Sequence, residues 1–300
     1  MINQWHILGA GSMGRLMACK LERIGLRPVL LLRGAGAAST RLLLREGAVE
    51  TTFDVPSVPA SRVPGEISGL LVTTKAMDAV GAVEQVLASL QADAPVVLLH
   101  NGMGVIDTLR EAYPALNLYA GTTTEGAYRD GDTLVHAGRG DTVIGGQGSG
   151  APGWFRPFAG GGERFEWNLD IDAVLWRKLL INCAINPLTA LHRCRNGALL
   201  DNPALRAEVE LLCEELAEVS LARGNDRGAT CALDWALGVI QATAGNQSSM
   251  LQDVQAGRPT EIEYITGYLV GEAQRLGVAC PRNERLLAQV RALDSTATSN

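Results

Sequence analysis

Three glycines near the N-terminus constrain the fold more than any other feature of the sequence. Gly9, Gly11 and Gly14 follow a largely apolar run over residues 4–8 and precede a helical pattern that continues to about Ile24. A glycine-rich turn between a buried strand and a helix lets the backbone approach a pyrophosphate, which the first helical N–H groups then bind. The motif therefore predicts a dinucleotide-binding α/β domain; the alternative is a tight turn without a ligand.

The hydrophobic pattern changes along the chain and predicts two domains. Up to about residue 150, apolar runs alternate with helical patterns, which indicates a parallel sheet whose strands are buried on both faces. After about residue 170 the strand signals fade and helical patterns dominate. We predict strands at 4–8, 29–32, 70–73, 96–100, 118–121 and 142–145, a helix at 78–91, loops at 34–38 and 148–162, helices at 172–192, 203–223, 230–242, 259–276 and 282–293, and a frayed tail at 294–300.

Composition and charge exclude some classes of function. A net charge of -6 argues against a general nucleic-acid binder, although a local basic pocket can still bind an anionic small molecule. No apolar run is long enough to span a membrane, and the N-terminus does not resemble a signal peptide. The six cysteines contain no Cys-x-x-Cys pair. We expect reduced thiols, no metal site and a cytoplasmic protein.

Arg33 stands directly after the predicted second strand and bears on the choice of dinucleotide. An acidic residue there would bind a ribose 2′-hydroxyl, whereas an arginine suits a 2′-phosphate. The sequence therefore favours NADP over NAD or FAD, with a solvated surface arginine as the competing interpretation. Lys75 and Asn101 follow two further predicted strands, at the sheet edge where ligands bind. The alternatives are a solvated loop lysine and a turn-forming asparagine.

Lys178, Asn182 and Asn186 recur every four residues within the mostly apolar segment 175–191. On a helix this spacing places all three side chains on one face. A lysine and two amides on an otherwise buried helix are costly unless a polar group lies opposite them. Together with the glycine-rich turn, the spacing predicts a substrate that reacts with a bound nucleotide cofactor. The competing interpretations are a lysine paired on a surface helix and amides bonded between helices.

Several further motifs join these residues, and together they resemble the ketopantoate reductase (2-dehydropantoate 2-reductase) family from about residue 4 to about residue 290. The segments that carry the resemblance are Gly9-Ala10-Gly11-Ser12-Met13-Gly14, Lys75, His100-Asn101-Gly102-Met103-Gly104, Gly121-Thr122-Thr123-Thr124, Trp176-Arg177-Lys178-Leu179, Asn182-Cys183, Ile185-Asn186-Pro187-Leu188-Thr189-Ala190, Asn196-Gly197, Ser248-Ser249-Met250-Leu251-Gln252-Asp253 and Thr260-Glu261-Ile262. The Lys-xxx-Asn-xxx-Asn-Pro and Ser-Ser-Met-Leu-Gln-Asp segments are specific to the family, whereas the glycine motif is not.

The resemblance implies an α/β Rossmann domain over 1–170 followed by an all-α domain over 171–300, of the kind found at the C-terminus of 6-phosphogluconate dehydrogenase. It further implies that NADPH and the substrate bind in the cleft between the domains. Lys178 would be the general acid that protonates the developing alkoxide while NADPH delivers hydride to the C2 carbonyl. The chemistry needs such a group, because hydride addition builds negative charge on the oxygen.

The same resemblance assigns the remaining site residues. It implies substrate contacts for Asn101, Lys178, Asn182, Asn186, Asn196, Asn246 and Ser249, and cofactor contacts for the six residues of the glycine turn, Arg33, Lys75, Asn101, Ala127 and Glu261. Glu261 would orient the lysine and keep it charged. Competing roles are a helix-ending turn at Asn196, a helix N-cap at Ser248 or Ser249, and an exposed first-turn acid at Glu261.

Two positions depart from the family pattern. Thr266 stands where an asparagine is common, and Glu125 stands where other polar or small residues occur. Both departures bear on the fine shape of the pocket.

The function that we expect is NADPH-dependent reduction of 2-dehydropantoate to (R)-pantoate, a step towards pantothenate, by a monomer or homodimer that binds neither nucleic acid nor membranes. The alternatives are a related reductase of another branched 2-oxo acid and a non-catalytic NADP-binding sensor. A sensor would need the glycine turn and Arg33 but no proton donor, so the presence of both Lys178 and Glu261 argues against it. One methylene changes substrate discrimination by only about 1–3 kcal/mol, so pocket shape decides between the acids.

Overall fold

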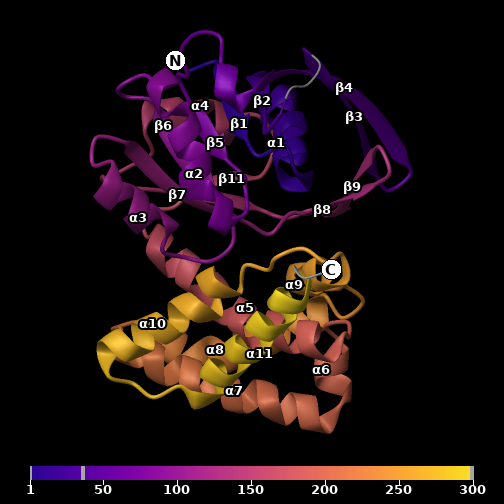
Figure 1. Ribbon diagram of the computed structural model, residues 1–300, viewed down its shortest axis with the longest axis vertical. Coiled ribbons are helices and arrows are strands. Elements are labelled where there is room, and N and C mark those ends of the chain that lie inside the picture. Colours follow the sequence, from indigo (N-terminus) through magenta and orange to yellow (C-terminus); the bar gives the residue numbers. More distant parts are fainter. Residues whose placement is uncertain (1, 35–37, 298–300) are drawn as a thin grey trace. The chain divides into compact units, whose positions relative to one another are not determined.

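The computed structural model describes residues 2–34 and 38–297, which form two compact units (Figure 1). The first unit contains the chain up to His100 together with Val105–Ile171, and the second contains Asn101–Gly104 and the chain from Asp172 onward. The first is an α/β unit and the second is helical, so the expected fold class is confirmed.

A mixed sheet forms the centre of the first unit, and its strand order within the described residues is β11-β10-β7-β6-β5-β1-β2-β4-β3-β9-β8. The strands from β7 to β4 in this order pair in parallel, as the alternating pattern predicts. The strand bounds are β1 Gln4–Leu8, β2 Arg27–Leu32, β3 Ser39–Glu46, β4 Val49–Pro59, β5 Leu70–Val72, β6 Pro95–Leu99, β7 Asn117–Thr123, β8 Gly126–Asp130, β9 Thr133–Gly138, β10 Thr142–Gly145 and β11 Phe165–Trp167.

Two β-hairpins extend this sheet beyond the predicted strands. β3 and β4 are joined through Gly47, and β8 and β9 are joined through Gly131; both glycines have positive φ, which glycine adopts without strain. The alternation of buried Phe53 and Val55 with exposed neighbours in β4 is typical of a strand, although no strand was predicted there. β4 pairs with β2 on one side and with β3 on the other, so the hairpins continue the parallel core.

Helix α1 (Ser12–Arg23) is packed between the two parts of the sheet. It contacts β1 and β2 of the parallel core as well as β3, β8 and β9 of the extension (Figure 1). The other helices of this unit are α2 Ala76–Val86, α3 Val105–Ala112 and α4 Arg156–Gly160, with 3-10 turns at Ala60–Arg62, Leu87–Ser89 and Gly153–Phe155.

The prediction of a surface loop over residues 148–162 is wrong for residues 153–160, which form a 3-10 turn and helix α4. Trp154, Phe155 and Phe158 are buried, and the Trp154 ring lies 5.3 Å from that of Trp5 between ring centroids. Burying large aromatic rings outweighs the loop-forming tendency of the surrounding glycines and prolines. The Gly- and Pro-rich composition therefore hid a short helix that completes the core.

The second unit is a bundle of helices with a continuous apolar core. Its elements are α5 Ile171–His192, α6 Ala198–Asp201, α7 Pro203–Ala222, α8 Asp226–Ala242, α9 Ser249–Gln255, a 3-10 turn at Ile262–Tyr264, α10 Thr266–Leu276 and α11 Pro281–Ala297. The side chains of Asn202, Asn225 and Ser248 cap α7, α8 and α9 by accepting backbone N–H bonds. Among the described helices, none combines the length and apolarity that crossing a bilayer requires.

Several helix boundaries in this unit differ from the prediction, among them the start of α8, which is Asp226 and not residue 230. The expected helix over 259–276 is interrupted, because the carbonyl of Tyr264 accepts the N–H of Met103 (2.9 Å), and α10 begins only at Thr266. The expected frayed tail is helical as far as residue 297. Asp294 is held there because it accepts the Thr260 hydroxyl (2.7 Å). Residues 298–300, like 35–37 of the first predicted loop, lie outside the described residues.

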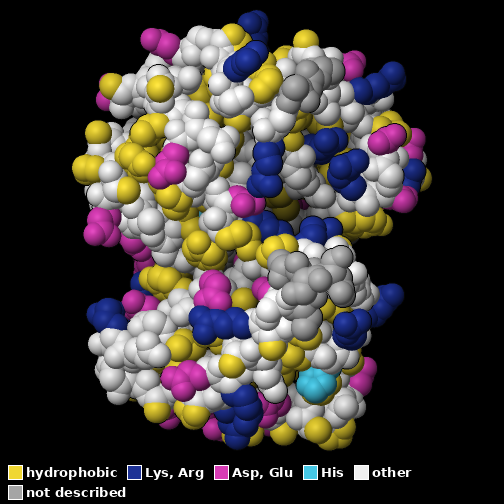
Figure 2. Space-filling view, viewed as in Figure 1, with side chains coloured by type: hydrophobic (Ala, Val, Ile, Leu, Met, Phe, Trp, Pro, Cys, Tyr) yellow, Lys and Arg dark blue, Asp and Glu magenta, His cyan; other side chains and the backbone are white. Residues whose placement is uncertain are grey.

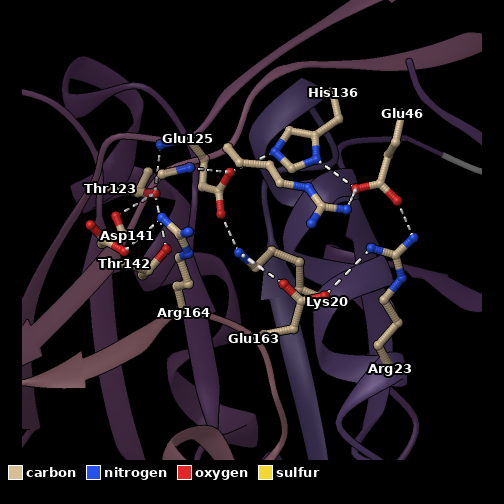
Figure 3. Close-up of polar contacts among 12 residues, drawn as sticks. Lys20, Arg23, Glu46, Thr123, Glu125, His136, Asp141, Thr142, Glu163 and Arg164 are labelled. Atoms are coloured by element: carbon tan, nitrogen blue, oxygen red, sulfur yellow. Dashed lines mark hydrogen bonds and ion pairs between the residues drawn. The ribbon is translucent and has the colours of Figure 1, made fainter. Parts of the chain in front are cut away.

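A network of buried charges fixes α1 against the sheet extension (Figure 3). Lys20 of α1 forms an ion pair with Glu125, which follows β7, and its ammonium lies 3.2 Å from a Glu163 oxygen. Both ring nitrogens of His136 in β9 approach carboxylates, Nε2 at 2.6 Å from Glu125 and Nδ1 at 2.9 Å from Glu46. Each ring nitrogen thus has a carboxylate oxygen within hydrogen-bond distance. These contacts join α1 to four other segments of the unit.

Arg23, one turn after Lys20, extends the same network to β3. Its guanidinium forms an ion pair with Glu46, and this bond is the main reason why the pKa of that carboxyl is lowered to about 2. The network therefore contains alternating positive and negative groups, each with an oppositely charged neighbour, which is the arrangement that buried charges require.

Lys20→Met should lower the free energy of unfolding by about 3 kcal/mol, because it leaves the buried Glu125 without its ammonium partner. Urea unfolding of the wild-type and variant chains measures the loss. The matched control is Arg110→Met, which removes an exposed cation paired with Asp107 at 3.0 Å. It should cost under about 1 kcal/mol. Equal losses in the two variants would show that the buried network contributes no more than a surface pair.

Candidate functional site

The glycine turn between β1 and α1 is closely packed at two of its glycines and open at the third. Gly9 has φ +107°, and a side chain at Gly14 would overlap the Gly9 carbonyl and the Thr73 hydroxyl. That hydroxyl donates to the Gly9 carbonyl (2.7 Å), which ties the turn to the end of β5. A Cβ atom built at Gly11 meets nothing within 4 Å. The space above Gly11 is where a pyrophosphate would approach the backbone.

The start of α1 is suited to an anion. Its first turn contains no acidic side chain, and Gly11, its N-cap residue, offers no side-chain bond to the free N–H groups. The positive end of the helix dipole is therefore not neutralised by the helix itself. Figure 2 shows Lys and Arg side chains gathered on the visible face over α1, β8 and β9, although the whole chain has a net charge of -6. These features fit a dinucleotide phosphate.

The other residues predicted to bind cofactor in the first unit lie at different sheet positions. Arg33 directly follows β2 and is largely exposed, with its Nη2 atom 2.9 Å from Asp78 Oδ2 in α2. Lys75 is the N-cap residue of α2, just beyond the carboxyl end of β5. Ala127 lies in the edge strand β8, next to a register shift in its pairing with β9. No pattern in the sequence predicts the contact between Arg33 and Asp78.

Lys178 lies on α5 of the second unit, among buried neighbours that include Trp176 and Leu179. The lysine is itself partly buried. Removal from water is the larger effect on the ammonium and lowers its pKa to about 8, while the Glu261 carboxylate opposes that shift. A lysine with such a pKa exchanges a proton near neutrality, as an acid–base catalyst must.

Glu261 is held in place within the second unit by the segment that follows His100. It is only 8% exposed, so it is not the exposed first-turn acid that was the competing interpretation. Asn101 Nδ2 donates to Glu261 Oε2 (2.9 Å). Gly102, the next residue, has φ +79°, and a side chain there would overlap the Tyr264 carbonyl. The Asn101–Gly104 segment therefore packs tightly beside the carboxylate.

The rest of α5 brings Asn182 and Asn186 to the same helix face as Lys178, as the spacing predicts. Pro187 lies inside this helix and has no N–H to donate to the carbonyl of Cys183, one turn earlier. Asn186 is buried and Asn182 is partly exposed. Both amides therefore lie close to the turn of α5 in which Pro187 removes one backbone hydrogen bond.

A hydroxyl pair connects this helix to the start of α9. Thr189 Oγ1 lies 2.7 Å from Ser248 Oγ, which also accepts the N–H of Leu251 (3.1 Å). Ser248 is therefore the N-cap of α9, one of the two roles left open for it. Ser249, the first residue of the helix, is exposed. The pairing with Thr189 was not predicted, because nothing in the sequence connects residues 59 positions apart.

Asn196 and Asn246 are brought together by paired backbone segments. The N–H of Asn196 donates to the Asn246 carbonyl (3.0 Å), and its side-chain amide donates to Thr243 Oγ1 (2.8 Å). Asn196 is buried, and within the described residues its Oδ1 atom has no hydrogen-bond partner. An unpaired buried acceptor is costly, so a ligand donor at this position would remove a penalty.

The structure explains the two departures from the family pattern. Glu125 is a member of the buried ion network of the first unit. Thr266 is fully buried at the start of α10, and within the described residues its hydroxyl has no hydrogen-bond partner. Burial raises the pKa of the Cys183 thiol well above its usual range. All six cysteines are free thiols, and burial also raises the pKa of Cys19 to about 12, which makes it unreactive.

Comparison with known families identifies matches over both units. A family model described as ketopantoate reductase PanE/ApbA matches residues 5–148, and the model of the C-terminal part of the same family matches residues 170–294. The 2-dehydropantoate 2-reductase of Shigella flexneri is 36% identical over 96% of this chain and 94% of its own. The enzyme of the same name from Archaeoglobus fulgidus is 31% identical over 98% and 99%.

Solved structures with the same fold cover almost the whole chain. A PanE/ApbA family ketopantoate reductase from Ralstonia eutropha superposes with a TM-score of 0.86 at 26% identity, over 98% of this chain and 99% of that one. A D-mandelate dehydrogenase, in a ternary structure with NADH and anilino(oxo)acetate, gives a TM-score of 0.89 at 23% identity over the same shares. At this identity, the likeness to the D-mandelate dehydrogenase shows a shared fold alone.

Gly11→Ala and Gly14→Ala should separate ligand binding from folding at the glycine turn. The Gly11 methyl enters open space, so urea unfolding should be unchanged while NADPH binding, measured by calorimetry, weakens at least about tenfold. The Gly14 methyl overlaps the Gly9 carbonyl and should cost about 1–3 kcal/mol of stability. Full NADPH affinity in the folded Gly11→Ala variant would contradict the phosphate site.

Proposed function

The chain belongs to the ketopantoate reductase PanE/ApbA family, and on that premise we propose that it reduces 2-dehydropantoate to (R)-pantoate with NADPH, a step towards pantothenate. The observation that carries the proposal is the partly buried Lys178 ammonium beside the Glu261 carboxylate, on a helix that also presents Asn182 and Asn186. We further propose that the protein acts in the cytoplasm as a monomer or homodimer.

Lys178 is the proton donor in this proposal. When bound, the reduced nicotinamide supplies the hydride that adds to C2 of the oxo acid. The C2–O π bond opens, and its electron pair takes a proton from Lys178 Nζ to give the 2-hydroxyl group. The resulting neutral amine regains a proton from solvent. Its pKa of about 8 suits this role, because the ammonium is both populated at neutral pH and acidic enough to donate.

Glu261 keeps the lysine charged and oriented in the resting enzyme. Without the carboxylate, burial alone would lower the lysine pKa further. The bond from Asn101 fixes one oxygen of the carboxylate, whose charge raises the lysine pKa. Asn101 thus acts as a positioning residue for the proton donor, in addition to the cofactor and substrate contacts that we assign to it.

The remaining polar residues of the second unit suit the other groups of the substrate. We assign the substrate contacts to Asn182, Asn186, Asn196, Asn246 and Ser249. The unpaired Oδ1 of Asn196 suits a hydroxyl donor, and 2-dehydropantoate carries a 4-hydroxyl group. A site built to bond a hydroxyl rejects analogues that lack it, because its own polar atom is then left unpaired.

The cofactor contacts that we assign in the first unit are Gly9, Ala10, Gly11, Ser12, Met13 and Gly14 of the turn, together with Arg33, Lys75 and Ala127. The open space above Gly11 and the basic side chains over α1 support a phosphate-bearing ligand there. Arg33 supports NADPH over NADH.

An assay panel tests the substrate directly. NADPH oxidation, followed by absorbance, should be faster with 2-dehydropantoate than with 3,3-dimethyl-2-oxobutanoate, which differs only in lacking the hydroxyl, by at least about a hundredfold in kcat/KM. Equal values for the two acids would favour a reductase of other branched 2-oxo acids. The absence of turnover with every 2-oxo acid, with NADPH still bound, would favour a non-catalytic sensor.

Lys178→Met should lower turnover by about 10²–10⁴-fold with little change in the NADPH dissociation constant. In the wild type, reduction should slow as the pH rises through about 8, because the donor loses its proton; the residual rate of the variant should lack this dependence. Arg177→Met is the matched control, since this exposed neighbour lies over the Trp235 ring, 5.1 Å from its centroid. An unchanged rate in Lys178→Met would remove the acid role.

A further inference from the structure

The Arg33 side chain has an acidic partner within the first unit. Its guanidinium Nη2 atom lies 2.9 Å from the Asp78 carboxylate, and the two side chains are 83% and 45% exposed. Arg33 follows β2, and Asp78 is the third residue of α2, the helix whose N-cap residue is Lys75. A carboxylate therefore occupies the position in front of the cation that we assign to the cofactor.

The two side chains favour different ribose substituents. An arginine after the second strand suits a 2′-phosphate, whereas a carboxylate near that strand accepts a ribose 2′-hydroxyl and repels a phosphate. In this chain the acid comes from α2, 45 residues after the arginine, and not from β2 itself. The site thus contains a group suited to each dinucleotide.

We propose that Asp78 is a specificity-determining residue that narrows the preference of this enzyme for NADP over NAD. Its carboxylate competes with the 2′-phosphate for Arg33 and for the positive end of α2, and it offers an acceptor to an unphosphorylated ribose. This inference rests on the proposed function, because it takes the ligand to be a nicotinamide dinucleotide.

The exposure of the pair sets the size of the effect. An exposed ion pair is worth little, so a 2′-phosphate can displace Asp78 from Arg33 at small cost. Repulsion between the carboxylate and the phosphate then remains, weakened by solvent. Asp78 therefore reduces the NADP preference by a modest factor and does not reverse it. We expect about threefold to tenfold.

A purely structural role for Asp78 makes a different prediction. An acid in the first turn stabilises the helix dipole, and its loss would lower stability without changing the choice of ligand. Asp107 provides the matched comparison, because it is the third residue of α3 and pairs with Arg110 at 3.0 Å. Asp78→Asn and Asp107→Asn remove the same charge from the same helix position.

Calorimetric titration with NADP⁺ and with NAD⁺ tests the proposal in the wild type and in both variants. Asp78→Asn should raise the ratio of NAD⁺ to NADP⁺ dissociation constants about threefold to tenfold, whereas Asp107→Asn should leave it unchanged. Urea unfolding should shift similarly in both variants.

The outcomes separate this inference from the proposed function. If both dinucleotides bind the wild type and Asp78→Asn leaves their ratio unchanged, or changes it no more than Asp107→Asn does, the specificity role is wrong and the reductase proposal stands. If the wild type binds neither dinucleotide, both proposals fail.

Discussion

The partial burial of the Lys178 ammonium is the constraint on which the second unit depends. An unpaired cation in this apolar helix would be costly, and the Glu261 carboxylate offsets part of that cost. The carboxylate is buried as well, so it needs its own bond from Asn101. That requirement explains why the four-residue segment after His100 packs with the helical unit. The lysine, the carboxylate and the amide form one connected arrangement.

In the first unit, α1 is held firmly while its first turn stays open. At the start of the helix, Gly9, Gly14 and Thr73 are in such close contact that no side chain fits. Further along, Lys20 fixes the helix through a buried ion pair with Glu125, and Arg23 adds a more exposed pair with Glu46 (Figure 3). The helix is therefore held at both ends, as a rigid binding site requires.

Buried and exposed charges serve distinct purposes in this chain. The Lys20 network is enclosed, so each of its ions must have a partner, and the network acts in folding. Arg33 and Asp78 are exposed, so their pairing is weak and can be exchanged for a ligand at small cost. The exposure of a charge pair, more than its distance, thus separates a structural role from a role in ligand selection.

Features that depend on near neighbours in the chain could be predicted from the sequence alone. The glycine turn, the buried parallel strands and the common face of Lys178, Asn182 and Asn186 follow from spacing alone, because strand and helix periodicities are fixed by backbone geometry. The missed hairpin β3–β4 also had local signals, in Gly47 and in the alternation about Phe53.

Contacts between residues that are distant in the chain could not be predicted and follow from the three-dimensional fold. Asp78 beside Arg33, Glu125 beside Lys20 and Asn101 beside Glu261 are separated by 45, 105 and 160 positions. Their pairing depends on strand order and helix packing, and no local pattern encodes it. The same holds for the interruption of the helix expected over residues 259–276, where a remote N–H group takes the Tyr264 carbonyl. Local propensity predicts an element, but competition for its hydrogen bonds by the rest of the fold decides where it ends.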